Sequence, residues 1–331
     1  MVNQEWRDCP VLVTGGMGFI GSNLVRRLVS LRAKVTVIDL NLTEYGAHSH
    51  NLADIAPSVE IVAADIGDDT ATAAAIGKAA VVFNLAGQTS HADSMTRPAA
   101  DLALNQAANL RFLEQIRTLN PALRIVYTST RQLYGRPRYL PVDEAHPIVP
   151  PDINGIHKFA AESYHLLYAR VYGLRATALR LTNVYGPRMR IRDAKQTFLG
   201  IWVRHVVEDG CFELWGGDQL RDFTYVDDLV DALLATAASP ATVGQVFNVG
   251  GCPPITLLAL AEQLVAIAGS GRFERRAFPE ERKKIDIGDF YSADGPFRAA
   301  TGWQPNTSLS SGLAETLAFY RSNLAHYLSE S

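Results

Sequence analysis

The sequence of 331 residues predicts an α/β protein built on a doubly wound parallel sheet. Two observations predict it: apolar runs of strand length alternate with helical patterns, and a glycine-rich turn joins the first run to the first helix. Such alternation is typical of a parallel sheet with helices on both faces. The predicted strands are residues 11–13, 35–38, 59–62, 80–83, 124–127, 176–181 and 245–249. The predicted helices include residues 20–28, 102–119, 158–172, 198–208 and 226–238.

The first strand, turn and helix form a phosphate-binding pattern. The apolar run 11–13 leads directly into Thr14-Gly15-Gly16-Met17-Gly18-Phe19-Ile20-Gly21. Glycines permit the tight turn, the approach of backbone to a pyrophosphate and the close packing of helix on strand. The N-terminus of the helix adds unpaired N–H groups. We therefore expect a dinucleotide site of the Rossmann type rather than a turn without ligand, with a pyrophosphate bound by Gly15, Gly18, Phe19, Ile20 and Gly21.

The second strand ends on a carboxylate that predicts which dinucleotide binds. Asp39 follows the apolar run 35–38 and lies 18 residues past Gly21. At this place a carboxylate accepts hydrogen bonds from the adenosine ribose hydroxyls, and it repels a 2′-phosphate. The expected cofactor is therefore NAD rather than NADP.

Composition indicates an ordinary water-soluble protein. Apolar residues make up 47% and charged residues 20% of the chain, and the net charge of -3 gives no reason to expect nucleic acid or a membrane as a partner. Cys9, Cys211 and Cys252 are far apart, so neither a disulfide framework nor a metal site is predicted. No apolar stretch has membrane-spanning length and the start lacks a signal-peptide pattern, so we expect a cytoplasmic protein.

The alternating pattern ends near Pro187, which predicts a second lobe. We expect a dinucleotide-binding domain from residues 1–187 and about 222–248, and a smaller, discontinuous substrate-binding lobe from about 188–221 and 249–331. Ligands of doubly wound sheets bind at the carboxyl ends of the strands. The loops that should carry the chemistry are therefore residues 65–66, 84–91, 128–134 and 182–187.

Ordered motifs along nearly the whole chain carry a family resemblance. They are Thr14 to Gly21, Asp39, Asp65-Ile66, Leu85-Ala86-Gly87-Gln88, Asn105, Val126 to Thr130 with Tyr134-Gly135, Lys158 with Glu162, Asn183 to Arg188, Arg221 to Asp228, and Phe247 to Gly251. With these motifs the chain resembles the extended short-chain dehydrogenase/reductase family of NAD-dependent nucleotide-sugar epimerases and dehydratases. The resemblance implies further cofactor contacts from Asp65, Ile66, Leu85, Ala86, Gly87 and Lys158.

The resemblance implies oxidation of a sugar carbon, usually C4, by a bound NAD that later returns the hydride. The family's catalytic set is a Ser or Thr, a Tyr, and a Lys four residues after the Tyr. Thr130 matches the hydroxyl and Lys158 the lysine, but the tyrosine position is Asn154. A carboxamide has no useful basicity near neutral pH, whereas general-base assistance is worth about 10²–10⁴ in rate.

Another side chain must therefore serve as the base if the chain turns over. His91 follows the strand 80–83, where ligands bind, and His157 lies three residues beyond Asn154 on the same helix. Tyr134, from a neighbouring loop, is a third candidate. Asn154 itself can still orient a hydroxyl or a water.

Arg131-Gln132 marks a second departure from the family. Members that dehydrate carry an Asp-Glu pair directly after the catalytic hydroxyl residue, so elimination is disfavoured here. The Leu-Ala-Gly-Gln and Thr-Arg-Gln runs are more similar to the CDP-tyvelose type of 2-epimerase. Arg131 also suits a substrate carboxylate or phosphate.

The substrate implied by the resemblance is a nucleotide-diphosphate sugar. Arginine suits a diphosphate because its planar fork donates two hydrogen bonds. The expected substrate residues are Gln88, His91, Arg131, Asn183, Arg188, Arg221 and Arg282. A homodimer through the helices 102–119 and 158–172 is implied as well.

Together these observations favour an NAD-dependent nucleotide-sugar epimerase, with C4 ahead of C2 or C3. A decarboxylase or dehydratase with an atypical base is the second interpretation. An NAD-bound sensor or scaffold that has lost turnover is the third.

Overall fold

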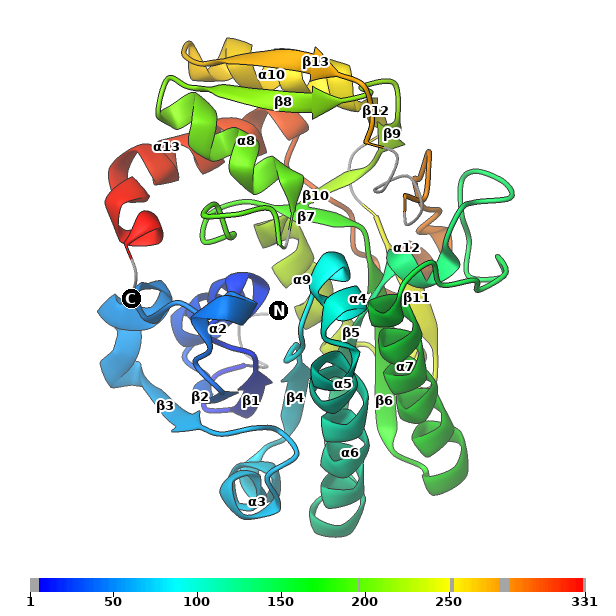
Figure 1. The fold of residues 1–331 in the computed structure, drawn as a ribbon. Coiled ribbons are helices and arrows are strands. Elements are labelled where there is room, and N and C mark those ends of the chain that lie inside the picture. The colour runs from blue at the N-terminus through cyan, green and yellow to red at the C-terminus, as the bar shows by residue number, and fades with distance from the viewer. Residues whose placement is uncertain (1–5, 196, 251–252, 280–285, 330–331) are drawn as a thin grey trace.

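The computed structural model describes residues 6–195, 197–250, 253–279 and 286–329. Within them, seven strands form one parallel sheet in the order β11-β6-β5-β4-β1-β2-β3. The strands are β1 (Pro10–Thr14), β2 (Lys34–Asp39), β3 (Val59–Ala63), β4 (Val81–Asn84), β5 (Arg124–Thr130), β6 (Arg175–Leu181) and β11 (Val246–Val249). The predicted doubly wound α/β fold is confirmed (Figure 1).

Alternating side chains of each central strand enter different cores. In β1, Val11 and Val13 pack in one buried cluster with Leu24 of α2 and Leu233 of α9, whereas Leu12 packs in another with Phe112 of α6. This two-residue period is what a strand covered by helices on both faces requires. The helices of this part are α2 (Phe19–Ser30), α3 (Asp69–Lys78), α4 (His91–Thr96), α5 (Pro98–Leu102), α6 (Ala108–Leu119), α7 (Ile153–Tyr172) and α9 (Val226–Ala238).

A smaller assembly lies beyond the carboxyl ends of the sheet strands, at the top of Figure 1. It has its own apolar core, in which Leu214 of β8 packs with Trp202, Leu264 and Leu317 of three helices. The strands pair as β7 (Asn183–Tyr185) with β10 (Phe223–Tyr225), β8 (Cys211–Trp215) with β13 (Arg272–Arg276), and β9 (Leu220–Arg221) with β12 (Ile255–Thr256). The helices are α8 (Phe198–Val207), α10 (Leu257–Ala268) and α13 (Leu309–Leu328), whereas α12 (Gly295–Thr301) packs beside β11, with Phe297 in the core of the large sheet.

Short helical segments complete the described chain. They are η1 (Thr43–Tyr45), η2 (Ser49–Ser58), η3 (Ala103–Ala107), η4 (Arg131–Tyr134) and η5 (Pro240–Thr242). The predicted helix 102–119 is present as the continuous run α5-η3-α6.

The start of α7 was predicted wrongly. Helix α7 begins at Ile153, five residues before the predicted start at Lys158. The reason is Asp152, whose side chain accepts a hydrogen bond from the Gly155 N–H at 2.7 Å and so caps the helix. The correction places Asn154 and Lys158 in the first two turns of one helix.

Candidate active site

A cavity of about 1070 Å³ lies between the carboxyl ends of the sheet strands and the smaller assembly. Both parts contribute to its wall, which contains Gly15 and Asp39 at one end and Arg221 and Trp215 at the other. Such a crevice is where doubly wound sheets bind ligands.

The glycine turn after β1 has the geometry that a pyrophosphate needs. Gly15 has φ +69°, and a Cβ there would lie 2.9 Å from the Ala86 nitrogen. A Cβ on Gly21 would lie 2.1 Å from the Gly15 oxygen, so close helix–strand packing depends on this glycine. Gly18 precedes α2 without a side-chain cap, so the first N–H groups of the helix are left for a ligand. The turn therefore fits a dinucleotide.

Asp39 ends β2 and lines the same cavity. Its carboxylate accepts hydrogen bonds from the backbone N–H groups of Met17 at 2.9 Å and Asn41 at 2.8 Å. Burial raises its pKa, and these two bonds oppose the rise. The carboxylate is thus fixed by the backbone at the strand end where a ribose would lie. All the predicted cofactor residues line this cavity: Gly15, Gly18, Phe19, Ile20, Gly21, Asp39, Asp65, Ile66, Leu85, Ala86, Gly87 and Lys158.

Lys158 brings a buried ammonium into the cavity wall. Its Nζ donates to the Thr128 carbonyl at 2.9 Å and lies 5.0 Å from the centre of the Tyr127 ring. Burial lowers its pKa to about 8, against the opposing charges of Asp101 and Glu162. Gly87 lies beside it, since a Cβ there would be 3.6 Å from Nζ. The Lys158 ammonium is therefore close to the end of β5 and to the loop after β4.

Thr130 is the last residue of β5 and also lines the cavity. Its Oγ1 accepts a hydrogen bond from the Gln132 N–H at 3.1 Å. Accepting that bond leaves the hydroxyl proton of Thr130 available to a ligand. Thr130 and Lys158 thus share one cavity with the glycine turn.

Asn154 lies in the cavity wall, but its amide is committed to protein partners. The side chain is 2% exposed. Its Nδ2 donates to the Gln88 carbonyl at 2.9 Å and to Asp101 Oδ2 at 3.1 Å. These bonds tie the start of α7 to the loop after β4 and to α5.

The two histidine candidates contact different carboxylates. The ring of His91 lines the cavity, with Nδ1 3.0 Å from Asp152 Oδ2. The contact is close, but its N–H direction departs from a good hydrogen bond. His157 does not line the cavity, and its Nδ1 is 2.7 Å from Asp101 Oδ1. A base must reach substrate, so the geometry favours His91 over His157.

Tyr134 is engaged elsewhere. Its hydroxyl donates to Asn248 Oδ1 at 2.7 Å and accepts from Arg180 Nη1 at 2.6 Å. Burial raises its pKa to about 12. It does not line the cavity, so its phenol is unsuited to serve as the base.

Three predicted substrate residues meet at the other end of the cavity. Arg131 Nη2 donates to Asn183 Oδ1 at 2.8 Å, and Arg221 contributes to the same wall. Burial, followed by the charge of Arg221, lowers the pKa of Arg131 to about 10. Arg221 pairs with Asp286 at 3.4 Å and donates to the Gly288 carbonyl. Two adjacent guanidinium groups can bind a dianion such as a diphosphate.

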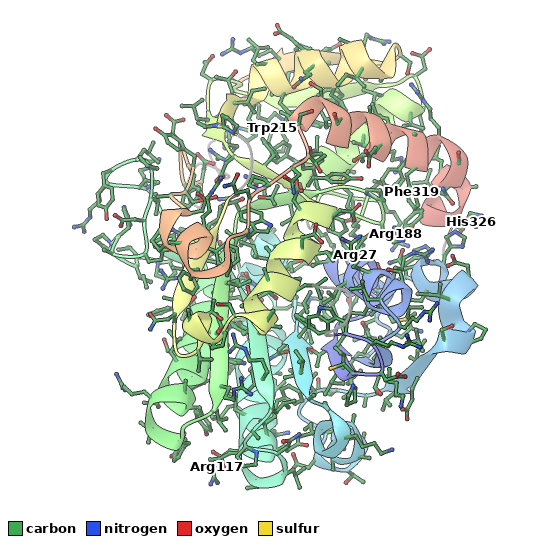
Figure 2. All side chains as sticks on the ribbon, turned by 180° about the vertical axis from the view of Figure 1, so that it is seen from behind. Arg27, Arg117, Arg188, Trp215, Phe319 and His326 are labelled. Atoms are coloured by element: carbon green, nitrogen blue, oxygen red, sulfur yellow. The ribbon has the colours of Figure 1, made fainter. Side chains whose placement is uncertain are left out.

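The structure does not place every predicted substrate residue at the cavity. Gln88 is buried, and its carbonyl and side chain bond to Asn154 and Ser90. Arg188 lies under α13, with its guanidinium 5.1 Å from the ring of Phe319 and 2.9 Å from Asn23 Oδ1 (Figure 2). Both predictions of direct contact are unsupported because these polar groups are used within the protein. Arg282 lies outside the described residues.

Sequence reasoning missed Asp152, Trp215 and Asp286. Trp215 and Asp286 reach the cavity from the smaller assembly, where no local pattern marked them. Asp152 is the partner of His91. Its position directly before α7, three residues before Gly155, is a helix-capping signal that could have been recognised in the sequence.

Among the described residues, no group of three or more His, Cys, Asp or Glu is arranged to hold a metal ion. In the same part of the chain, the helices fall short of the length and apolarity that a membrane span requires.

Comparison with known proteins agrees with this site. The pattern of the NAD dependent epimerase/dehydratase family matches residues 11–250. The UDP-glucose 4-epimerase of Mycolicibacterium smegmatis is 34% identical over 318 residues, covering 94% of this chain and 98% of the relative. A putative UDP-glucose 4-epimerase of Methanocaldococcus jannaschii is 30% identical over 315 residues, covering 95% and 99%. The structure of a Thermotoga maritima UDP-glucose 4-epimerase with UDP-glucose is similar, with a TM-score of 0.86, 28% identity and coverage of 95% and 99%.

The glycine turn, the fixed Asp39 and the shared cavity thus define a dinucleotide-binding protein. The chain belongs to the NAD-dependent epimerase/dehydratase family, within the extended short-chain dehydrogenases/reductases. The resemblance inferred from the motifs and the prediction of NAD as cofactor are confirmed.

Proposed function

We propose that the chain is an NAD-dependent nucleotide-sugar epimerase that works through a transient keto-sugar, with C4 favoured over C2 or C3. One observation carries the proposal: a single cavity joins the dinucleotide turn to Thr130 and Lys158, and to Arg221 on the opposite side. The two relatives named as UDP-glucose 4-epimerases support it.

The residues that fit NAD are the glycine turn for the pyrophosphate and Asp39 for the adenosine ribose. When bound there, NAD supplies a hydride acceptor that can return the hydride. Lys158 is suited to donate to ribose hydroxyls, because its ammonium lies in the wall between Thr128 and Gly87. This use does not require the missing tyrosine.

The proposed roles at the sugar follow from the cavity wall. The Thr130 hydroxyl donates to the sugar oxygen at which negative charge develops, which stabilises that charge. His91 takes the hydroxyl proton as the base. Asn154 acts by anchoring the loop that carries His91.

Arg221, Arg131 and Asn183 are proposed to bind the diphosphate. The sugar then extends from the arginine end of the cavity toward Thr130. The reacting carbon is thereby kept between the sheet side and the smaller-assembly side of the cavity wall. We propose accordingly that residues 1–187 and about 222–248 bind NAD, and that residues about 188–221 and 249–331 bind the nucleotide sugar. A homodimer through α6 and α7 is also proposed, since both helices leave apolar side chains exposed, among them Leu119, Ile156 and Val171.

A mass-spectrometric assay in heavy water tests the function. Protein is incubated with a panel of nucleotide sugars, and NMR then identifies the inverted carbon. An epimer without deuterium indicates oxidation and reduction at one carbon, whereas deuterium indicates inversion beside the ketone. Loss of water or carbon dioxide would instead support the dehydratase or decarboxylase alternative. NAD binding without any product would support the sensor or scaffold alternative.

A further inference from the structure

Two aspartate–histidine pairs flank the start of α7, and one of them faces the cavity. His91 is the first residue of α4, in the loop region after β4, and its side chain is 36% exposed. Its partner Asp152 precedes α7 and has a side-chain exposure of 0%. The other pair, Asp101 with His157, lies outside the cavity lining.

The Asp152 carboxylate is held in place by hydrogen bonds from α7 and η4. Oδ1 accepts from the Gly155 N–H at 2.7 Å, and Oδ2 accepts from Gln132 Nε2 at 2.9 Å. Burial raises the pKa of Asp152, but the charge of the nearby His91 ring and the hydrogen bonds from Gly155 and Gln132 bring it below its ordinary value. The positive end of the α7 dipole adds to this preference for the anion. The group is therefore ionised at neutral pH.

Other charged groups near His91 already have partners of their own. Asp93 on the same short helix is 2.9 Å from Lys195 and 3.6 Å from Arg97. Lys158 donates to the Thr128 carbonyl. Within the described residues, Asp152 is the carboxylate that comes within ion-pair distance of His91.

We propose that Asp152 is a positioning residue that orients His91 as the base, in place of the tyrosine that Asn154 replaces. The inference rests on the proposed epimerase function. A carboxylate on Nδ1 fixes the tautomer in which Nε2 is the free, basic nitrogen.

The step balances without a further reactant. The sugar O–H bond breaks and its proton moves to His91 Nε2, while the hydride from the adjacent C–H bond would be accepted by an NAD held at the glycine turn and Asp39. On return of the hydride, Nε2 gives the proton back to the oxygen. Asp152 stays ionised throughout.

The test is Asp152→Asn, because asparagine caps a helix about as well as aspartate, while it removes the charge and replaces the oxygen beside His91 and Gln132 by an NH2 group. With the protein as purified, we expect kcat to fall at least about 10-fold with a smaller change in KM, because the histidine loses its fixed tautomer.

The matched control is Asp68→Asn. Asp68 caps α3 by accepting from the Thr70 N–H at 3.0 Å, is exposed and does not line the cavity. This variant should keep kcat within about twofold, because Asp and Asn are nearly equivalent caps. Circular dichroism and NAD titration establish that both variants are folded.

A double-mutant cycle and NMR complete the test. His91→Gln should lower kcat by about 10²-fold or more, and adding Asp152→Asn should then cost little further. In ¹⁵N-labelled protein, the His91 imidazole signal is identified as the one that is missing from His91→Gln. This signal should show the Nδ1–H tautomer in the wild type and should change in Asp152→Asn. An unchanged imidazole signal, or an undiminished effect of Asp152→Asn in the His91→Gln background, would overturn the proposal. The NMR measurement does not depend on turnover. If no epimer is formed, the proposed function is refuted, but the contact between Asp152 and His91 can still be tested by NMR.

Discussion

By its place in the sequence motif, Asn154 stands where the family's tyrosine is expected, and we expect Asn154→Tyr to lower the proposed epimerase activity. The buried Asn154 amide donates to the Gln88 carbonyl at 2.9 Å and to Asp101 Oδ2 at 3.1 Å. A phenol cannot reproduce both bonds from the same place. Losing a hydrogen bond to a buried charged group costs about 1.5–3 kcal/mol. We expect the free energy of unfolding to fall by that amount.

The catalytic loss should follow from the loop after β4. Gln88 Nε2 donates to the Ser90 carbonyl at 3.0 Å, and Ser90 Oγ caps α4, which begins with His91. Releasing Gln88 therefore loosens the segment that presents the proposed base. A displacement of about 1 Å in an active site can cost about 10² in rate.

The assay is kcat for the epimerisation of a nucleotide sugar, combined with urea denaturation of the same samples. Asn154→Ala is the matched comparison, since it removes the same donors without adding a ring. We expect both variants to be slower than the wild type. A tyrosine variant that exceeds the wild-type rate would refute the reasoning, because the phenol would then be supplying a base that the native site lacks.

Three further predictions concern ionisable side chains whose pKa values are shifted by burial. Calorimetry should show NAD binding much more tightly than NADP, and Asp39→Ser should narrow the difference, because the carboxylate repels the 2′-phosphate; equal affinities in the wild type would contradict this. Lys158→Met should abolish most activity yet stabilise the fold by about 1–3 kcal/mol in urea denaturation at pH 7, since it removes a buried charge whose pKa is lowered to about 8. Burial lowers the pKa of His165 from 6.5 to about 4, so protonation favours the unfolded chain and stability should fall as pH drops from about 6.5 to 4, by about 3 kcal/mol. In His165→Gln the loss of stability over that pH window should be smaller, and an unchanged pH dependence would argue against the assignment.

Much of the fold could be predicted because its signals are local. The glycine turn and the strand that ends on Asp39 each lie within a short stretch, and alternation of apolar runs specifies a parallel sheet. The start of α7 was missed because Asn154 and Gly155 are weak helix formers inside the first turn. The cap supplied by Asp152 outweighs that local preference.

The cofactor half of the site was predictable for the same reason, since its residues lie at strand ends and in one motif. The substrate half depends on partners distant in sequence. Arg188 suits a phosphate by residue type, yet Asn23 and Phe319 take its guanidinium. The place of His91 after a strand end already favours it over His157, and the tertiary structure adds that the His91 ring lines the cavity.

The departures from the family's pattern are connected to one another in space. Gln132, at a position that dehydratases use for an acid or base, donates to Asp152, which in turn contacts His91. Asn154, at the tyrosine position, anchors the loop that carries His91 through Gln88. Asp152 caps α7 and accepts from Gly155 and Gln132, so the burial of its charge is compensated within the protein, and the same carboxylate lies 3.0 Å from the cavity-lining His91. This connected arrangement supports the proposal of a base on the loop after β4.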